Sequence, residues 1–116
     1  QNRIAVELDV GEGSFERLPS ACAIQAIRIV QEALTNVRKH ARVDRARVRL
    51  QREGRWIHLT IEDDGIGWDR KLSPNGHGFG VQAMRERAEG AGGQLQIHTA
   101  PGAGTRVAAI LPGDIL

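Results

Sequence analysis

The chain has 116 residues, of which 41% are hydrophobic and 26% charged, as expected for one globular domain with a single hydrophobic core. A formal net charge of +2 and an aromatic content of 3% give little support for nucleic-acid binding through a basic or base-stacking surface. The single cysteine, Cys22, excludes an internal disulfide and a thiolate metal cage, and no run of residues is long enough to span a membrane.

The N-terminal part of the chain predicts one strand and one long helix. Residues 3–8, RIAVEL, alternate apolar and polar side chains as a half-buried strand does. The chain starts within this strand without a signal-peptide pattern, so we expect residues 1–116 to be a single domain of a longer protein. Residues 21–41 have the period of an amphipathic helix, and Ser20 is expected to cap its start. The predicted core face of this helix consists of Ala23, Ile27, Val30, Leu34, Val37 and Ala41.

The remaining elements are two hairpins and a second helix. Residues 45–51 and 55–63 alternate apolar and polar side chains, and the short turn between them predicts an antiparallel pair. A glycine-rich segment follows, and then a helix over residues 80–91 that a pair of glycines ends. Residues 94–99 and 105–111 form the second predicted hairpin. Paired strands with few helices indicate an α+β two-layer sandwich, and a Rossmann fold is excluded because strands and helices do not alternate throughout.

Three polar residues follow one line of the first helix. Glu32, Asn36 and Lys39 lie within about 60° of each other on a helical wheel, opposite the predicted core face. An asparagine oxygen suits Mg²⁺, a glutamate one turn earlier can orient a nucleophile or a metal-bound water, and a lysine offers charge to phosphate. The alternative is a solvated helix face with an incidental pattern of charges.

The segment EDDGIG, residues 62–67, contains an inward-facing acid. Asp63 has the same strand phase as three apolar residues, so its carboxylate should face the interior or a pocket. A buried carboxylate requires a donor, and an exocyclic amine such as that of adenine is a suitable one. Gly65 and Gly67 would let a flat ligand approach the backbone. The alternative is an acidic turn at the end of a strand.

Two more glycine-rich segments could contribute to a site. GHGFG, residues 76–80, leads into the second helix and could direct backbone N–H groups at a phosphate, although a flexible loop has the same pattern. GAGT, residues 102–105, places the Thr105 hydroxyl in the same phase as inward-facing residues. The alternative for this second segment is a hairpin turn followed by a β-branched residue.

In this order, the four segments resemble the motifs of the GHKL superfamily of ATP-binding domains (gyrase, Hsp90, histidine kinase, MutL). Within it, the chain closely resembles the catalytic domain of two-component sensor histidine kinases of the NarX/DesK-like group. QEALTNVRKHA (31–41) matches the N box, DDGIG (63–67) the G1 box, GHGFGVQAMRERA (76–88) the G2 box with its helix, and GAGTRV (102–107) the closing motif. The resemblance runs from about Ile4 to Pro112. It implies a Bergerat-type fold, a two-layer α/β sandwich with a mixed, mostly antiparallel sheet and helices on one face.

The resemblance also implies ATP and Mg²⁺ as ligands. By this likeness Asn36 is the Mg²⁺ ligand, Asp63 binds the adenine amine, and Thr105 completes the adenine pocket. The implied catalytic residues are Glu32, Asn36 and Lys39. The implied ATP-binding residues are Asn36, Lys39, His40, Asp63, Gly65, Gly67, Gly76, His77, Gly78, Gly80 and Thr105.

The implied activity is phosphorylation of a histidine on a separate dimerisation helix of the same kinase. None of His40, His58, His77 and His98 is placed as a phosphoacceptor, so we expect the chain alone to be nearly inactive. The implied partners are ATP, the dimerisation and phosphoacceptor domain, and a response regulator, with no direct nucleic-acid partner. We expect a monomer in isolation, a homodimer for the full kinase, and a cytoplasmic location as part of a membrane-anchored bacterial sensor.

Three other functions remain open from the sequence. An anti-sigma-factor serine kinase shares the N and G1 boxes, but the MRERA helix (84–88) argues against it. A non-catalytic ATP-sensing module would not need the intact set of Glu32, Asn36 and Lys39. The arginine-rich strand from Arg45 to Arg55 could bind nucleic acid, or be a solvated sheet face or a docking surface for the rest of a kinase.

Overall fold

The computed structural model describes residues 3–11, 13, 19–69 and 80–113 of the chain. This part forms five strands, two α-helices and a short π-helix. In chain order they are β1 (Ala5–Val10), α1 (Ser20–Asn36), η1 (Val37–Ala41), β2 (Arg45–Glu53), β3 (Trp56–Asp63), α2 (Val81–Gly90), β4 (Gln94–Thr99) and β5 (Thr105–Pro112).

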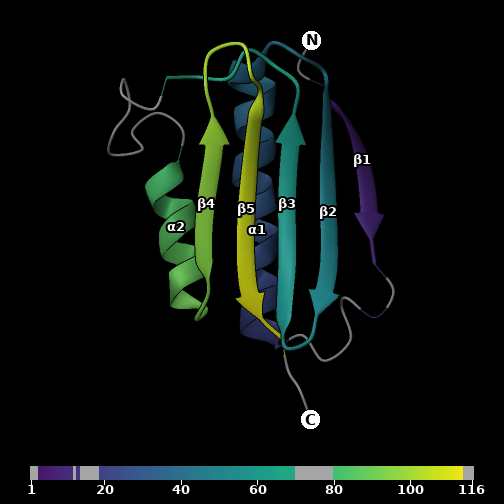
Figure 1. The fold of residues 1–116 in the computed structure, drawn as a ribbon, viewed down its shortest axis with the longest axis vertical. Coiled ribbons are helices and arrows are strands. Elements are labelled where there is room, and N and C mark those ends of the chain that lie inside the picture. Colours follow the sequence, from purple (N-terminus) through teal and green to yellow (C-terminus); the bar gives the residue numbers. More distant parts are fainter. Residues whose placement is uncertain (1–2, 12, 14–18, 70–79, 114–116) are drawn as a thin grey trace.

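The strands form one sheet in the order β1-β2-β3-β5-β4. β1 pairs with β2 in parallel, and the other neighbours are antiparallel. The parallel pair is possible because α1 provides the crossover between β1 and β2. Both helices lie behind the sheet in Figure 1, α1 behind the central strands and α2 beside β4. The predicted two-layer sandwich, with a mixed, mostly antiparallel sheet and helices on one face, is therefore confirmed.

The core lies between this helical face of the sheet and the two helices. Alternate residues of the central strands point into it, as period-2 patterning requires, and Ile57, Leu59 and Leu111 are almost fully buried. Helix α2 adds Val81, Met84 and Ala88 to the core, while Ala91, beyond its last residue, is half-buried.

The predicted core face of α1 is wrong in its phase. The buried residues are Cys22, Ala26, Ile29 and Ala33, whereas Ile27 is 55% exposed. Of the other predicted residues, Val37 and Ala41 are buried, and Val30, Leu34 and Ala23 are half-buried. Apolar residues occupy more than half of the circumference of this helix, so the period alone allows two faces, and packing against the sheet selects the one that contains Cys22, Ala26, Ile29 and Ala33.

β1 is an edge strand and is not half-buried as predicted. All six of its residues are exposed, including Leu8 at 66%. Its apolar side chains pair in register with inward-pointing residues of β2, for example Leu8 with Val48. They therefore belong to the helical face of the sheet, but no described helix covers them.

The start of α1 differs from its prediction, whereas the end of α2 agrees with its prediction. The N-cap position of α1 is Pro19, and Ser20 is the first helical residue and makes no capping hydrogen bond, so the predicted serine cap is wrong. The end of α2 follows the prediction. The N–H groups of Gly92 and Gly93 donate to the carbonyls of Glu89 (2.9 Å) and Ala88 (2.8 Å), with Gly92 at φ +91°.

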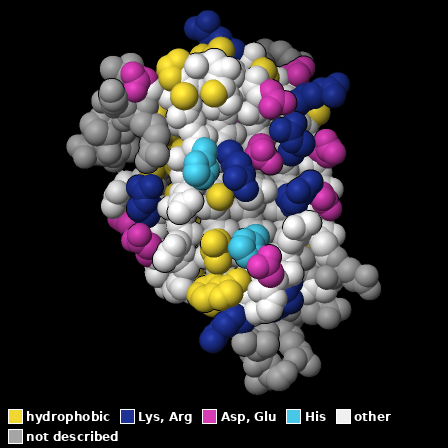
Figure 2. Space-filling model, viewed as in Figure 1, with side chains coloured by type: hydrophobic (Ala, Val, Ile, Leu, Met, Phe, Trp, Pro, Cys, Tyr) yellow, Lys and Arg dark blue, Asp and Glu magenta, His cyan; other side chains and the backbone are white. Residues whose placement is uncertain are grey.

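The open face of the sheet, the side opposite the helices, is polar and charged over β1–β3 (Figure 2). Arg49 pairs with Asp9 at 3.2 Å, and Arg47 pairs with Asp64 at 3.2 Å. Because these arginines have acidic neighbours, the surface favours a solvated sheet face over a nucleic-acid site. No helix in the described part of the chain is long and apolar enough to cross a membrane.

Candidate functional site

A small cavity lies between the C-terminal end of the first helix and the ends of β3 and β5. Its volume is about 20 Å³, enough for one water molecule, so side chains must move apart to admit a planar base. Its described lining residues are Ala33, Asn36, Val37, His40, Ala41, Ile61, Asp63, Gly67, Trp68, Met84, Ile97, Thr105 and Val107. The cavity therefore brings together residues of the N box, the G1 box and the closing motif.

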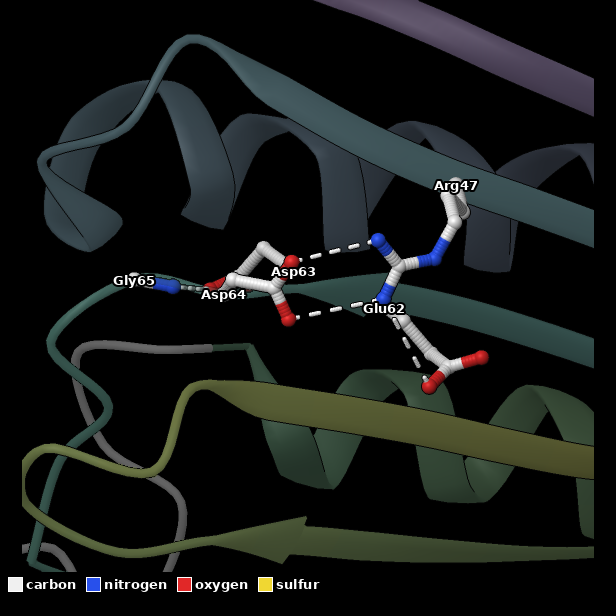
Figure 3. A network of polar contacts seen from close by, with 5 residues as sticks. All are labelled: Arg47, Glu62, Asp63, Asp64 and Gly65. Atoms are coloured by element: carbon white, nitrogen blue, oxygen red, sulfur yellow. Dashed lines mark hydrogen bonds and ion pairs between the residues drawn. The ribbon is translucent and has the colours of Figure 1, made fainter.

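Asp63 is the polar centre of this cavity. It is the one buried polar or charged residue in the described part of the chain, with 8% of its surface exposed. Its Oδ1 accepts a hydrogen bond from the Gly65 N–H at 2.8 Å (Figure 3), which fixes the carboxylate at the strand end. Burial raises the pKa of the Asp63 carboxyl, and the charge of Asp64 adds to this, while the Gly65 N–H and the Arg47 guanidinium oppose it.

Arg47 of β2 holds the neighbouring acid on the open face. Its Nη1 donates to Asp64 Oδ2 at 3.2 Å and its Nη2 donates to Asp64 Oδ1 at 3.4 Å, which makes the contact bidentate (Figure 3). Arg47 Nη2 also lies 4.0 Å from Glu62 Oε2. The hydrogen bond and charge of Arg47 lower the pKa of Asp64. The two adjacent carboxyls thus have opposite environments, one solvent-exposed and paired, the other buried.

The turn after β3 is held on both sides by backbone contacts. The Ile66 N–H donates to the Ala41 carbonyl at 2.9 Å, and the Ile66 carbonyl accepts from the Gly102 N–H at 2.6 Å. A Cβ on Gly65 would overlap the backbone of Ala41, and one on Gly67 would overlap the Ala100 carbonyl. Both glycines are therefore required by close backbone approach, whether or not a ligand is bound.

A threonine pair closes the cavity on the β4–β5 side. Thr105 lines the cavity and lies between two register partners, Asp63 of β3 and Thr99 of β4. The two threonine hydroxyl oxygens are 2.9 Å apart. Thr99 Oγ1 also accepts from the Trp68 N–H at 3.1 Å, so this pair connects the hairpin to the segment after the G1 box.

The polar line on the first helix is divided by the structure. Asn36 lines the cavity and therefore lies beside the core face, not opposite it as predicted. The backbone then changes to the π-helix η1, which is wound differently from an α-helix, and His40 lines the cavity. Lys39 is exposed and is not among the described lining residues. A wheel drawn for one continuous α-helix cannot show this change.

Glu32 is not among the described lining residues of the cavity. Its carboxylate contacts Gly80, where an added Cβ would overlap it. Gly80 has φ +63° and is the N-cap of α2, so Glu32 faces the N-terminal end of that helix. The predicted phosphate-binding residues Gly76, His77 and Gly78 lie outside the described residues.

The donor set can be tested for Mg²⁺. No group of three or more His, Cys, Asp or Glu side chains in the described ranges could hold a metal by itself. Asn36 lines the cavity and offers one side-chain amide oxygen, and Glu32 is one helical turn away. This set fits Mg²⁺, which takes few protein ligands and completes its octahedron with water and phosphate oxygens.

Sequence reasoning missed several residues of the site. Met84 lines the cavity, although the sequence assigned it no role in the site. Thr99 was also missed, although its alternation with Ile97 on β4 and its place opposite Thr105 gave a usable signal. The π-helix has no sequence signal of its own.

Comparison with known proteins identifies the family. The model of the histidine kinase-, DNA gyrase B- and HSP90-like ATPase family matches residues 22–115. The signal transduction histidine-protein kinase/phosphatase DegS of Brevibacillus brevis is 37% identical over 100 residues, covering 86% of this chain and 26% of DegS. The sensor histidine kinase YxjM of Bacillus subtilis is 36% identical over 107 residues, covering 92% of this chain and 25% of YxjM.

Solved structures of histidine kinases have the same fold as this chain. The blue-light activated histidine kinase EL346 of Erythrobacter litoralis has a TM-score of 0.79 at 26% identity, over 97% of this chain and 36% of that one. The histidine kinase AdeS of Acinetobacter baumannii has a TM-score of 0.74 over 98% of this chain and 56% of that one, and its 13% identity supports the fold alone.

The fold and the site define an ATP-binding domain of the GHKL class. The chain belongs to the histidine kinase-, DNA gyrase B- and HSP90-like ATPase family, and its predicted likeness to sensor histidine kinases of the NarX/DesK-like group is confirmed. It spans about a quarter of the length of DegS and of YxjM.

Proposed function

We propose that this domain binds ATP with Mg²⁺ and supplies the γ-phosphate for phosphorylation of a histidine on a separate dimerisation helix. One observation carries the proposal: a buried carboxylate, Asp63, lies in a cavity between the helices and the sheet with one oxygen held by the Gly65 N–H. The remaining oxygen is suited to accept a hydrogen bond from the adenine amine, which would supply the donor that a buried carboxylate needs.

The polar residues of the helix have separate roles in this proposal. Asn36 binds the Mg²⁺ ion, which neutralises charge on the β- and γ-phosphates when it is bound. Lys39 and His40 approach the phosphates from η1. Gly80, the N-cap of α2, leaves the N–H groups at the start of that helix available to the phosphates. Glu32, against Gly80, is placed to orient the acceptor or a metal-bound water.

The reaction is an in-line transfer. A ring nitrogen of the acceptor histidine attacks the γ-phosphorus, the bond from that phosphorus to the β–γ bridging oxygen breaks, and ADP leaves. Placement and charge neutralisation supply most of the catalysis. The proposed partners are therefore the phosphoacceptor domain of the same kinase, which forms a homodimer, and a response regulator that receives the phosphate in the cytoplasm.

The experiment that tests nucleotide binding uses the fluorescence of Trp68, which lines the cavity. Trp56, 38% exposed, is first replaced by Phe so that Trp68 alone reports. A non-hydrolysable ATP analogue with Mg²⁺ should bind saturably. Asp63→Asn should weaken binding about 10- to 150-fold, the cost of a hydrogen bond to a charged group.

Asp64→Asn is the matched control, because Asp64 is adjacent and charged but exposed and paired with Arg47. Its Kd should stay close to that of the parent chain. Absence of binding at millimolar nucleotide would refute the proposal.

The role of Asn36 is tested by varying the metal. Asn36→Ala should leave nucleotide affinity in EDTA nearly unchanged and should remove most of the gain in affinity that Mg²⁺ gives the parent chain. An equal loss with and without Mg²⁺ would contradict the assignment of Asn36 as the metal ligand.

A further inference from the structure

We propose that Thr99 is a positioning residue whose hydroxyl fixes the direction of the Thr105 O–H bond, so that Thr105 offers only acceptor lone pairs to the base. The inference rests on the proposed nucleotide site and makes it more specific. With its proton directed at Thr99, the Thr105 hydroxyl selects a purine that carries an amino group at this edge of the ring over one that carries an oxo group.

The Thr99 hydroxyl has three polar neighbours. Its oxygen is 3.1 Å from the Trp68 backbone nitrogen, 3.0 Å from the Gly104 carbonyl oxygen and 2.9 Å from Thr105 Oγ1. A hydroxyl has one proton to donate and two lone pairs to accept with. The carbonyl can only accept, so the Thr99 proton goes to Gly104. The Trp68 N–H fills one lone pair, which leaves the other for the Thr105 proton.

The opposite direction of the Thr99–Thr105 hydrogen bond is unfavourable for the Gly104 carbonyl. If Thr99 donated to Thr105 instead, the carbonyl of Gly104 would lose the Thr99 hydrogen bond. Gly104 is buried, and both threonines are half-buried. A buried carbonyl that loses its hydrogen bond is unfavourable by about 1–3 kcal/mol. The observed distances therefore favour one direction, in which Thr105 donates to Thr99.

The direction of this hydrogen bond determines which groups the cavity presents to a ligand. Thr105 and Asp63 are register partners on β5 and β3, and both line the cavity. An ionised Asp63 only accepts, and Thr105 has already used its single proton. This edge of the cavity therefore consists of acceptors. An exocyclic amino group has two N–H donors that can bond to these acceptors. An oxo group at the same place is itself an acceptor and can form no hydrogen bond with them.

The test compares the full chain with Thr99→Val, which keeps the shape and removes the hydroxyl, and with Thr99→Ser, which keeps the hydroxyl. Calorimetry gives the Kd of ATP and of inosine triphosphate, which differs by an oxo group in place of the amine. The parent chain should prefer ATP. In Thr99→Val the Thr105 hydroxyl is free to turn and donate, so the ratio of ATP to inosine triphosphate affinity should fall about three- to tenfold. Thr99→Ser should keep the parent ratio.

A purely structural role for Thr99 makes a different prediction. Thr99→Val would then weaken both nucleotides equally, and an unchanged ratio overturns the inference. Thr105→Val provides a second test if Thr99→Val does not fold: it removes one acceptor from this edge, so the ratio of ATP to inosine triphosphate affinity should fall. An unchanged ratio in Thr105→Val would also overturn the inference.

The inference and the proposed function fail in distinguishable ways. If the parent chain binds ATP, and Asp63→Asn weakens that binding as expected while Thr99→Val leaves the ratio unchanged, only the role of Thr99 is refuted. If the parent chain binds neither nucleotide, the proposed function is refuted and this inference with it.

Discussion

Asp63 is subject to two opposing demands. Ionised, it is the acceptor that the proposed base-binding role needs, yet its burial disfavours the charged form. The Gly65 N–H offsets only part of this cost, because it contacts one of the two carboxylate oxygens. Such a residue is expected to reduce the stability of the fold while it serves the site.

This conflict predicts a pH-dependent effect of Asp63→Asn on stability. Burial raises the pKa of Asp63 in the folded chain, so the folded chain binds this proton more tightly than the unfolded chain does. The free energy of unfolding therefore falls as the pH rises from the ordinary value of 3.8 through the raised value, and stays lower at neutral pH. Asparagine removes the charge and can still accept from Gly65. Its Tm at pH 7 should exceed that of the parent chain by a few degrees, and the difference should disappear below pH 3.8.

Asp64→Asn is the control with the opposite sign. Arg47 lowers the pKa of Asp64, so Asp64 stabilises the fold above 3.8 and this contribution is lost as the pH falls through its lowered value. The variant should have a slightly lower Tm than the parent chain at pH 7 and an equal Tm in acid. Thermal unfolding followed by circular dichroism across pH measures both variants. A lower Tm for Asp63→Asn at neutral pH would contradict the account of its burial.

At the scale of elements, α1 shows how packing selects one face of a helix that is apolar on several sides. Ile29 is fully buried, while Ile27, two residues earlier, is 55% exposed. We expect Ile29→Ala to cost about 2–5 kcal/mol of unfolding free energy because it leaves a cavity in the core. Ile27→Ala should change it by about 0.5 kcal/mol or less. Urea unfolding of the two variants measures the difference, and equal costs would contradict the observed phase.

The contact between η1 and the turn after β3 leads to a second prediction at this scale. A methyl group on Gly65 would overlap the Ala41 backbone, so Gly65→Ala should cost about 1–3 kcal/mol through overpacking. Gly90→Ala is the matched control, because Gly90 ends α2 with no atom within 4 Å of an added Cβ. It should be neutral or stabilise by up to about 1 kcal/mol. Equal effects of the two substitutions in urea unfolding would show that the turn can move away from η1.

The elements themselves could be predicted from sequence because each has a local signal. Period-2 alternation gave β2 through β5 almost at their observed bounds, and paired glycines gave the end of α2. Asp63 could also be found, because one charged residue stood in the phase of a buried strand. Local patterning is enough for such features because they depend on neighbours in sequence.

Features that depend on distant packing could not be predicted. The phase of α1 was ambiguous because several of its faces are apolar, and the exposure of β1 follows from the absence of a described helix over that edge. The π-helix ends at Ala41, whose carbonyl accepts a hydrogen bond from the Ile66 N–H in the turn after β3, a contact between segments distant in sequence. Within this π-helix His40 lines the cavity and Lys39 is not among the described lining residues. The hydrophobic periodicity of the sequence does not reveal this change of helix type.

At the scale of the whole molecule, the described histidines are poorly placed to accept phosphate. His58 and His98 pair in register with Ile110 and Arg106, which belong to the open face of the sheet. The cavity lies on the helical side of the same sheet, so the sheet separates these histidines from it. His40 lines the cavity itself and belongs to the binding surface. An acceptor brought by another domain would instead approach from outside the site.

This arrangement predicts a large difference between the chain alone and the chain joined to an acceptor. In a fusion, the dimerisation and phosphoacceptor helices of a sensor histidine kinase of the NarX/DesK-like group precede Gln1. With γ-labelled ATP and Mg²⁺, the fusion should form acid-labile phosphohistidine at least about 100-fold faster than the chain alone, because placement supplies much of the rate. Replacing the acceptor histidine of the added domain by glutamine should abolish labelling, and Asp63→Asn should reduce it in proportion to lost nucleotide binding. Equal labelling of the chain alone, at His40 or elsewhere, would show instead that this domain contains its own acceptor.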